Sequence, residues 1–229
     1  GKISEIGKIK EGAKRMVDAS DLIVAPGFVD PHTHYDAQIC WDPLITSSSW
    51  HGVTSLVMGN CGVGLAPCKP DVHEIAAWDL VNVEAIPIVV LGKGVTWDWE
   101  SFPEYLDSIG KNNYAMDIGA MIGHGPIRSY VMGMDRCQGK EEASDNEIAE
   151  MAKITKEAIE AGALGFSTSR TYLHRDKFGE YVPGTEATAK EMRKIANTIA
   201  DLGQGTLEIV SDWMDQDIEL DWVKEFVEK

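Results

Sequence analysis

Two histidines separated by one residue follow an apolar segment near the start of the chain, in the sequence Pro-Gly-Phe-Val-Asp-Pro-His-Thr-His at residues 26–34. Residues i and i+2 of a strand point to the same side, so the imidazoles of His32 and His34 can approach one cation. Zinc binds imidazole nitrogens at roughly 2.0–2.1 Å. A bare pair of this kind is more often two surface histidines, but the Gly-Phe-Val-Asp context at a strand end favours a metal site.

A second strand-like segment leads into a cysteine between an asparagine and a glycine, in Gly-Val-Thr-Ser-Leu-Val-Met-Gly-Asn-Cys-Gly at residues 52–62. The ends of parallel barrel strands meet at one face, so Cys61 would lie beside the histidines. Its thiolate can join them on a metal, because the metal itself lowers the thiol pKa. The alternative is a buried structural cysteine, which is the commoner role of a lone cysteine.

The elements that must position these residues alternate between short β-type segments and longer helical patterns. The β-type segments are residues 23–34, 53–60, 116–123, 163–168 and 206–211. Ser144 and Glu147 form a capping box that begins a helix ending at Gly162, and an apolar stripe from Met192 ends at Gly203. Weaker helical patterns cover residues 101–109 and 217–228. This alternation predicts an α/β fold built of βα units around a parallel sheet.

Five βα units in 229 residues predict an incomplete TIM-like (β/α)8 barrel over residues 26–229, because eight units need about 250 residues or more. Residues 1–25 contain two short β-type segments, at 2–7 and 15–19, with no upstream partners. We interpret them as the remnant of a small N-terminal β-sandwich domain whose remainder is missing.

The composition excludes several classes of partner. The formal charge of −16, with an isoelectric point near 4.7, repels phosphate backbones and anionic bilayers, so we expect neither nucleic acid nor a membrane as partner. No apolar stretch approaches the roughly 20 residues of a membrane helix and no signal segment is apparent, so we expect a cytoplasmic protein. The four cysteines show no disulfide spacing and are expected to be reduced. The oligomeric state is not predicted.

The segment from Ala25 to Cys68 resembles the N-acyl-D-amino-acid deacylases (D-aminoacylases) of the amidohydrolase superfamily. The histidine pair indicates only the superfamily, whereas Gly-Asn-Cys-Gly is more specific, because most amidohydrolases have no cysteine ligand. The resemblance continues through residues 123–128 and 162–168. It implies an amidohydrolase barrel with one or two divalent ions, expected to be zinc, held by His32, His34 and Cys61.

The resemblance also implies substrate-binding residues. Tyr172 follows the fourth strand at the place of a pocket-lining tyrosine, and His124 and Arg128 match a motif at the third strand end, in or near the pocket. Two alternatives stay open. His124 can bind the metal itself or contact a residue that binds it, and Arg128 can pair with a carboxylate on the rim of the pocket. The remaining candidates are assigned to hydrogen bonding or packing (Ser167, Ser169) and to surface or loop positions (His51, His73, His174).

One position departs from the family pattern. The family has a metal-binding histidine at the end of the fifth strand, where this chain has Val210. Valine cannot bind a metal, so either Glu208 or Asp212 substitutes, or the site binds one metal differently. The catalytic aspartate that the family carries on its eighth strand is expected beyond Lys229.

The activity implied is metal-dependent hydrolysis of a linear C–N amide bond, in a small N-acyl-D-amino acid, by a zinc-activated water. One alternative is a cyclic-amide hydrolase of the dihydroorotase or hydantoinase kind, although no lysine ends the fourth or fifth strand to carry the carboxylate those enzymes use. Another is an inactive fragment or pseudoenzyme, and residues 1–229 alone are expected to be inactive. The loop over residues 169–184 differs from the family's, so the acyl group and the exact substrate are not predicted.

Overall fold

The computed structural model describes residues 2–73, 76, 80–81, 85–137, 141–176 and 179–229. In these residues the strands are β1 (Phe28–Asp30), β2 (Val53–Met58), β3 (Asp117–Ala120), β4 (Ile122–Gly123), β5 (Gly165–Arg170) and β6 (Thr206–Ser211). They form two parallel sheets with the orders β1-β2-β3 and β4-β5-β6. The prediction of an α/β fold with parallel strands is confirmed, and β6 has the predicted bounds.

The two sheets are linked by backbone hydrogen bonds around Met121, the residue between β3 and β4. The Met121 N–H donates to the carbonyl of Met58 on β2 at 2.9 Å, and the Leu164 N–H donates to the carbonyl of Ala120 on β3 at 2.8 Å. The strands therefore follow one another in space in their chain order. Parallel neighbours in chain order need crossover connections, which the helices supply.

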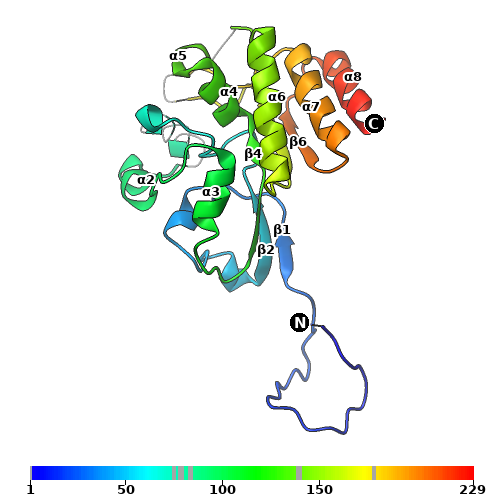
Figure 1. Cartoon of the computed structure of the whole chain (residues 1–229). Coiled ribbons are helices and arrows are strands. Elements are labelled where there is room, and N and C mark those ends of the chain that lie inside the picture. The colour runs from blue at the N-terminus through cyan, green and yellow to red at the C-terminus, as the bar shows by residue number, and fades with distance from the viewer. Residues whose placement is uncertain (1, 74–75, 77–79, 82–84, 138–140, 177–178) are drawn as a thin grey trace.

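Most of the helices lie between consecutive strands, and α8 follows the last one. The α-helices are α2 (Ile88–Gly94), α3 (Phe102–Ile109), α4 (His124–Met132), α5 (Met134–Cys137), α6 (Asp145–Glu160), α7 (Ala189–Leu202) and α8 (Gln216–Val227), and the 3₁₀ turns are η1 (Gln38–Cys40), η2 (Ser49–His51) and η3 (Pro70–Val72). Helices α6, α7 and α8 lie side by side along the sheet (Figure 1). No helix within the described residues has the length and hydropathy to cross a bilayer.

Local sequence signals set the ends of these helices. The predicted capping box is confirmed, because the Ser144 hydroxyl accepts the Glu147 N–H and the Glu147 carboxylate accepts the Ser144 N–H. Helix α7 ends at Gly203, whose φ of 64° is readily adopted by glycine. Ser101 and Glu104 form a second capping box at the start of α3, at the predicted position of that helix.

The hydrophobic core lies between the strands and the helices. Phe166 on β5 is fully buried, as are Met192 and Ile195 on α7, and Trp222 on α8 is 1% exposed. The apolar stripe predicted for α7 therefore faces the core. Burial of this stripe stabilises the packing of the helix against the sheet by roughly 1.5–3 kcal/mol for each large apolar side chain.

The structure differs from the predicted elements at two places. Residues 2–27 form no strand and extend away from the folded part of the chain as a loop (Figure 1). None of the described strands lies beside this segment to accept its backbone hydrogen bonds, which a stable strand requires. The two strands predicted at 2–7 and 15–19 are therefore absent, and the assignment of residues 1–25 to a β-sandwich domain stays a prediction. The segment predicted as one strand over residues 116–123 is divided at Met121 into β3 and β4, and helix α4 begins directly after it at His124.

We expect Ser144→Ala to lower the free energy of unfolding by about 1 kcal/mol, because the first turn of α6 loses the side-chain acceptor of its cap. Urea denaturation followed by circular dichroism measures the change. Ser4→Ala, in the exposed N-terminal segment, is the matched control and should leave the midpoint unchanged. Equal midpoints for Ser144→Ala and wild type would contradict the role of this cap.

Candidate metal centre

The three residues predicted to be metal ligands come together in the structure. One possible ligand atom from each of His32, His34 and Cys61 lies within 4.8 Å of the others. The Nε2 atom of His32 is 3.2 Å from the Sγ atom of Cys61. The two imidazole rings meet edge to face, with centroids 5.3 Å apart and planes inclined by 72°. This group therefore brings two imidazoles and a thiol together at the ends of β1 and β2.

Hydrogen bonds to β2 hold the histidine segment in place. The N–H and the hydroxyl of Thr33 both donate to the carbonyl of Val57, at 3.0 and 2.8 Å. The Asn60 side-chain amide donates to the carbonyls of Thr33 and Val57, at 3.1 and 3.0 Å. Because Thr33 lies between the two histidines, these bonds fix both imidazoles relative to the turn that carries Cys61.

The turn from Gly59 to Gly62 has three residues with positive φ: Gly59 at 77°, Cys61 at 56° and Gly62 at 72°. A Cβ atom on Gly59 would lie 2.0 Å from the carbonyl oxygen of Met121, and one on Gly62 would lie 2.8 Å from the Ser169 nitrogen. Glycine is therefore needed at both positions for backbone conformation and for space. Cys61 adopts its positive φ between them.

Side chains from several strand ends accept the N–H groups of this turn. The Gly59 N–H donates to Asp36 at 3.2 Å, the Cys61 N–H to Glu208 at 2.9 Å and the Gly62 N–H to the Ser167 hydroxyl at 2.9 Å. The same Ser167 hydroxyl donates to the carbonyl of Gly59 at 2.5 Å. The hydrogen-bonding role predicted for Ser167 is confirmed.

The structure distinguishes the two acidic residues considered as substitutes at Val210. Glu208 reaches the turn through its bond to the Cys61 N–H, whereas Asp212 accepts the Thr171 hydroxyl and the Tyr172 N–H, both at 2.7 Å. Burial raises the pKa of Glu208, and the Cys61 N–H and His32 act in the opposite direction. Of the two, Glu208 is the one bonded to a residue of the histidine–cysteine group.

Burial, together with the smaller electrostatic effects of the neighbouring His32 and His174, lowers the pKa of His34 to about 4. His34 is therefore neutral near pH 7, the state in which an imidazole binds a metal. His174 was predicted to be a surface or loop residue without a role. It is half-buried, its Nδ1 atom lies 3.0 Å from the Ser169 hydroxyl, and it acts on His34 electrostatically.

A cavity of about 360 Å³ opens beside the two histidines. Its lining includes His32, Thr33 and His34 together with Asp30, Tyr35 and Gln38. Tyr172, predicted to bind substrate, is not part of this lining. Its side chain is 41% exposed and its ring packs 5.0 Å from the ring of Tyr181.

Residues 15–228 match the amidohydrolase family. The chain belongs to that family. It is 34% identical over 200 residues to an uncharacterized protein of Mycobacterium tuberculosis, covering 84% of this chain and 32% of that protein. It is 33% identical over 201 residues to the D-aminoacylase of Alcaligenes xylosoxydans xylosoxydans, covering 87% of this chain and 36% of the enzyme.

A solved structure of D-aminoacylase, reported for the role of its binuclear metal centre, is similar with a TM-score of 0.64 and 26% identity, over 89% of this chain and 38% of that one. The resemblance to the D-aminoacylases is thus confirmed by sequence and by structure. The chain spans about a third of the length of the curated relatives it matches.

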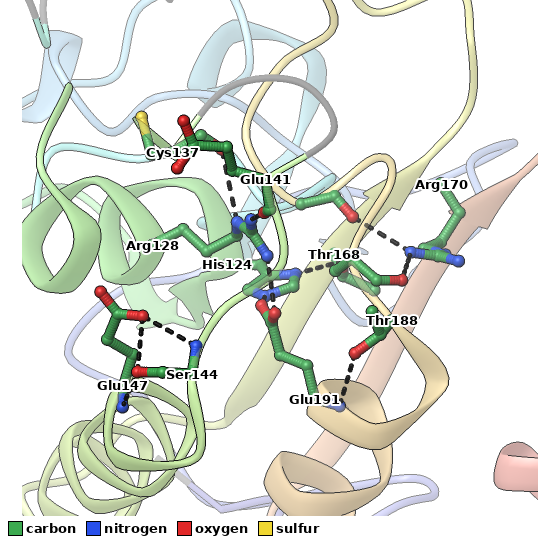
Figure 2. Close-up of polar contacts among 12 residues, drawn as sticks. His124, Arg128, Cys137, Glu141, Ser144, Glu147, Thr168, Arg170, Thr188 and Glu191 are labelled. Atoms are coloured by element: carbon green, nitrogen blue, oxygen red, sulfur yellow. Dashed lines mark hydrogen bonds and ion pairs between the residues drawn. The ribbon is translucent and has the colours of Figure 1, made fainter. Parts of the chain in front are cut away.

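This amidohydrolase chain also contains a charged group formed by His124, Arg128 and Glu191 (Figure 2). Glu191 on α7 bonds His124 through one oxygen at 2.8 Å and Arg128 through the other at 2.6 Å. The second ring nitrogen of His124 lies 2.9 Å from the Thr168 hydroxyl. The side chains of His124 and Glu191 are fully buried and that of Arg128 is 2% exposed.

The structure places His124 and Arg128 in the interior, bonded to Glu191, and neither lines the cavity beside the two histidines, so their contact with substrate stays a prediction. Because α4 begins at His124, both side chains are directed at α7, and Thr168 meets them from the face of β5 opposite Ser167. The alternative that Arg128 pairs with a carboxylate is correct, although the carboxylate is buried. Sequence reasoning missed Glu191, whose position three residues after the cap Thr188 is typical of an ordinary first-turn glutamate.

We expect His32→Ala and Cys61→Ala to weaken zinc binding by more than the roughly 10–100-fold typical of losing an outer-shell partner, because each removes a candidate ligand atom. Metal analysis and competition with a chelator measure the change. His51→Ala and Cys68→Ser, which lie outside the group, are the matched controls. Unchanged zinc affinity in both alanine variants would refute the site.

We expect Glu191→Gln to lower the free energy of unfolding by about 3–5 kcal/mol at pH 7, because it leaves the buried Arg128 without its counter-charge. Chemical denaturation measures the loss, with the exposed Glu180→Gln as control. Exposed ion pairs contribute at most about 1 kcal/mol. If the unfolding free energies of the two variants differ by less than about this amount, the role of the buried charge is contradicted.

Burial alone would raise the pKa of Glu191, but His124 and Arg128 lower it below its usual value of 4.5. A carboxylate with a lowered folded-state pKa stabilises the fold above the unfolded pKa. The contribution of Glu191 should therefore be lost as the pH falls below 4.5 through the folded pKa. Denaturation curves between pH 7 and pH 3 should show wild type and Glu191→Gln converging at the acid end.

Proposed function

We propose that this chain contributes the metal-binding part of a zinc-dependent hydrolase that cleaves linear C–N amide bonds in N-acyl-D-amino acids. The observation that carries the proposal is the convergence of His32, His34 and Cys61 within 4.8 Å. The similarity to D-aminoacylase at 33% identity supports the choice of substrate class.

The donor set fits zinc. Imidazole and thiolate are the ligands that zinc prefers, whereas magnesium and calcium prefer oxygen ligands. His34 is neutral near pH 7, since its pKa is about 4, and it can offer a nitrogen lone pair without losing a proton first. His32, His34 and Cys61 would hold the zinc, and the chemistry that it would supply there is activation of a water and polarisation of an amide carbonyl.

The residues of this chain would hold and orient the substrate. The cavity beside His32 and His34 is also lined by Tyr35 and Gln38, and it is proposed to take the acyl group. Tyr172 is proposed to contact substrate, because its side chain is exposed and Asp212 holds its backbone N–H at 2.7 Å. The general base is assigned to an aspartate outside residues 1–229, as the family resemblance implies.

The strand order supports the proposal that residues 26–229 form the first five βα units of a (β/α)8 barrel. Within each sheet every strand pairs in parallel with the next one along the chain, and β3 continues into β4 through Met121. The connections between paired strands contain α-helices or 3₁₀ turns. The chain matches about a third of the length of its relatives. Residues 1–229 alone are therefore proposed to bind metal without turnover.

The complete protein that contains this chain should hydrolyse N-acetyl-D-amino acids in preference to their L-enantiomers and to hydantoins. We expect His32→Ala to lower kcat/KM by about 10³-fold, equivalent to about 4 kcal/mol of lost metal-ion stabilisation. His51→Ala is the control and should retain full activity.

Chromatographic assay of the released amino acid distinguishes the alternatives. Turnover of hydantoins alone would identify a cyclic-amide hydrolase. A zinc-loaded protein without any turnover would identify a pseudoenzyme.

A further inference from the structure

We propose that Glu208 is a positioning residue of the metal centre, which holds the Cys61 backbone in the conformation that directs its thiol at His32. The inference rests on the proposed zinc site and adds to it a residue that does not itself bind the metal. Its basis is the hydrogen bond from the Cys61 N–H to the Glu208 carboxylate, which joins residues 147 positions apart in the sequence.

The register of β6 brings Glu208 to this turn. Glu208 pairs with Ser167 on β5, and both side chains reach the turn, Glu208 at the Cys61 N–H and Ser167 at the Gly62 N–H. Two adjacent strands thus accept two successive N–H groups of one turn. A single shift of register would turn Glu208 to the other face of the sheet and break this arrangement.

Cys61 needs such a restraint because of its backbone conformation. Its φ of 56° is uncommon for a residue with a side chain, and such conformations persist where surrounding contacts determine them. A carboxylate that accepts an N–H forms a charge-assisted bond stronger than one between neutral groups. The bond therefore holds Cys61 Sγ at its distance of 3.2 Å from His32 Nε2.

Neighbouring residues of the strand end do not take this role. Val210 has no hydrogen-bonding side chain, and both oxygens of Asp212 accept bonds from Thr171 and Tyr172. Glu208 also lies outside the group of ligand atoms that come within 4.8 Å of one another. The geometry therefore favours positioning of the thiol over direct binding of the cation by the carboxylate.

The test measures cobalt affinity in the complete protein, because Co²⁺ replaces zinc and its bond to a thiolate gives a charge-transfer absorption band. We expect Glu208→Ala to weaken Co²⁺ binding by about 10–100-fold and to reduce this band. Glu208→Gln should restore most of both, because its amide oxygen still accepts the Cys61 N–H. Glu180→Ala, which removes an exposed carboxylate in the loop between β5 and α7, is the control and should match wild type.

Three outcomes would overturn the inference. Glu208→Ala with wild-type affinity and absorption would show that the hydrogen bond does not position the thiol. Glu208→Gln as weak as Glu208→Ala would show that the charge, as in a direct ligand, is what matters. A wild-type protein that binds no Co²⁺ would overturn the proposed metal centre itself, and the inference with it. Circular dichroism confirms that each variant is folded.

Discussion

The hydrogen bonds to the Gly59–Gly62 turn are the constraint on which the candidate site depends. The turn places three residues at positive φ, and its N–H groups are accepted by Asp36, Ser167 and Glu208. These acceptors come from separate βα units, so the turn takes its conformation only when the strands are assembled. The position of the thiol is thus a property of the whole sheet and not of the turn alone.

Strand β5 connects this site to the helical layer because its side chains alternate between two faces. Ser167 and Ser169 face the candidate metal site, where they bond the turn and His174. Phe166 and Thr168 face the helices and contact His124. The buried ion pairs of Glu191 therefore support the same strand whose other face holds the turn at Cys61, which relates the stability of the helical layer to the geometry of the site.

The two buried polar groups differ in what their burial accomplishes. Around Glu191, a carboxylate, an arginine and a histidine satisfy one another, so the charge is retained in the interior with its hydrogen bonds complete. Around His34, burial keeps the imidazole neutral, with a pKa of about 4, and leaves it suited to bind a cation. Burial thus leaves a fully paired charge in one place and a neutral imidazole in the other.

Local spacing was sufficient to identify the strand–helix alternation, the capping box at Ser144 and the three residues that converge as candidate metal ligands. These features depend on neighbours within a few residues, or on the rule that parallel strands end at one face. The start of α4 at His124, the partner Glu191 and the choice of Glu208 over Asp212 depended on contacts between residues 67 to 147 positions apart or on side-chain directions. Such contacts leave no periodic signal in the chain, because they arise only when the strands and helices have packed together.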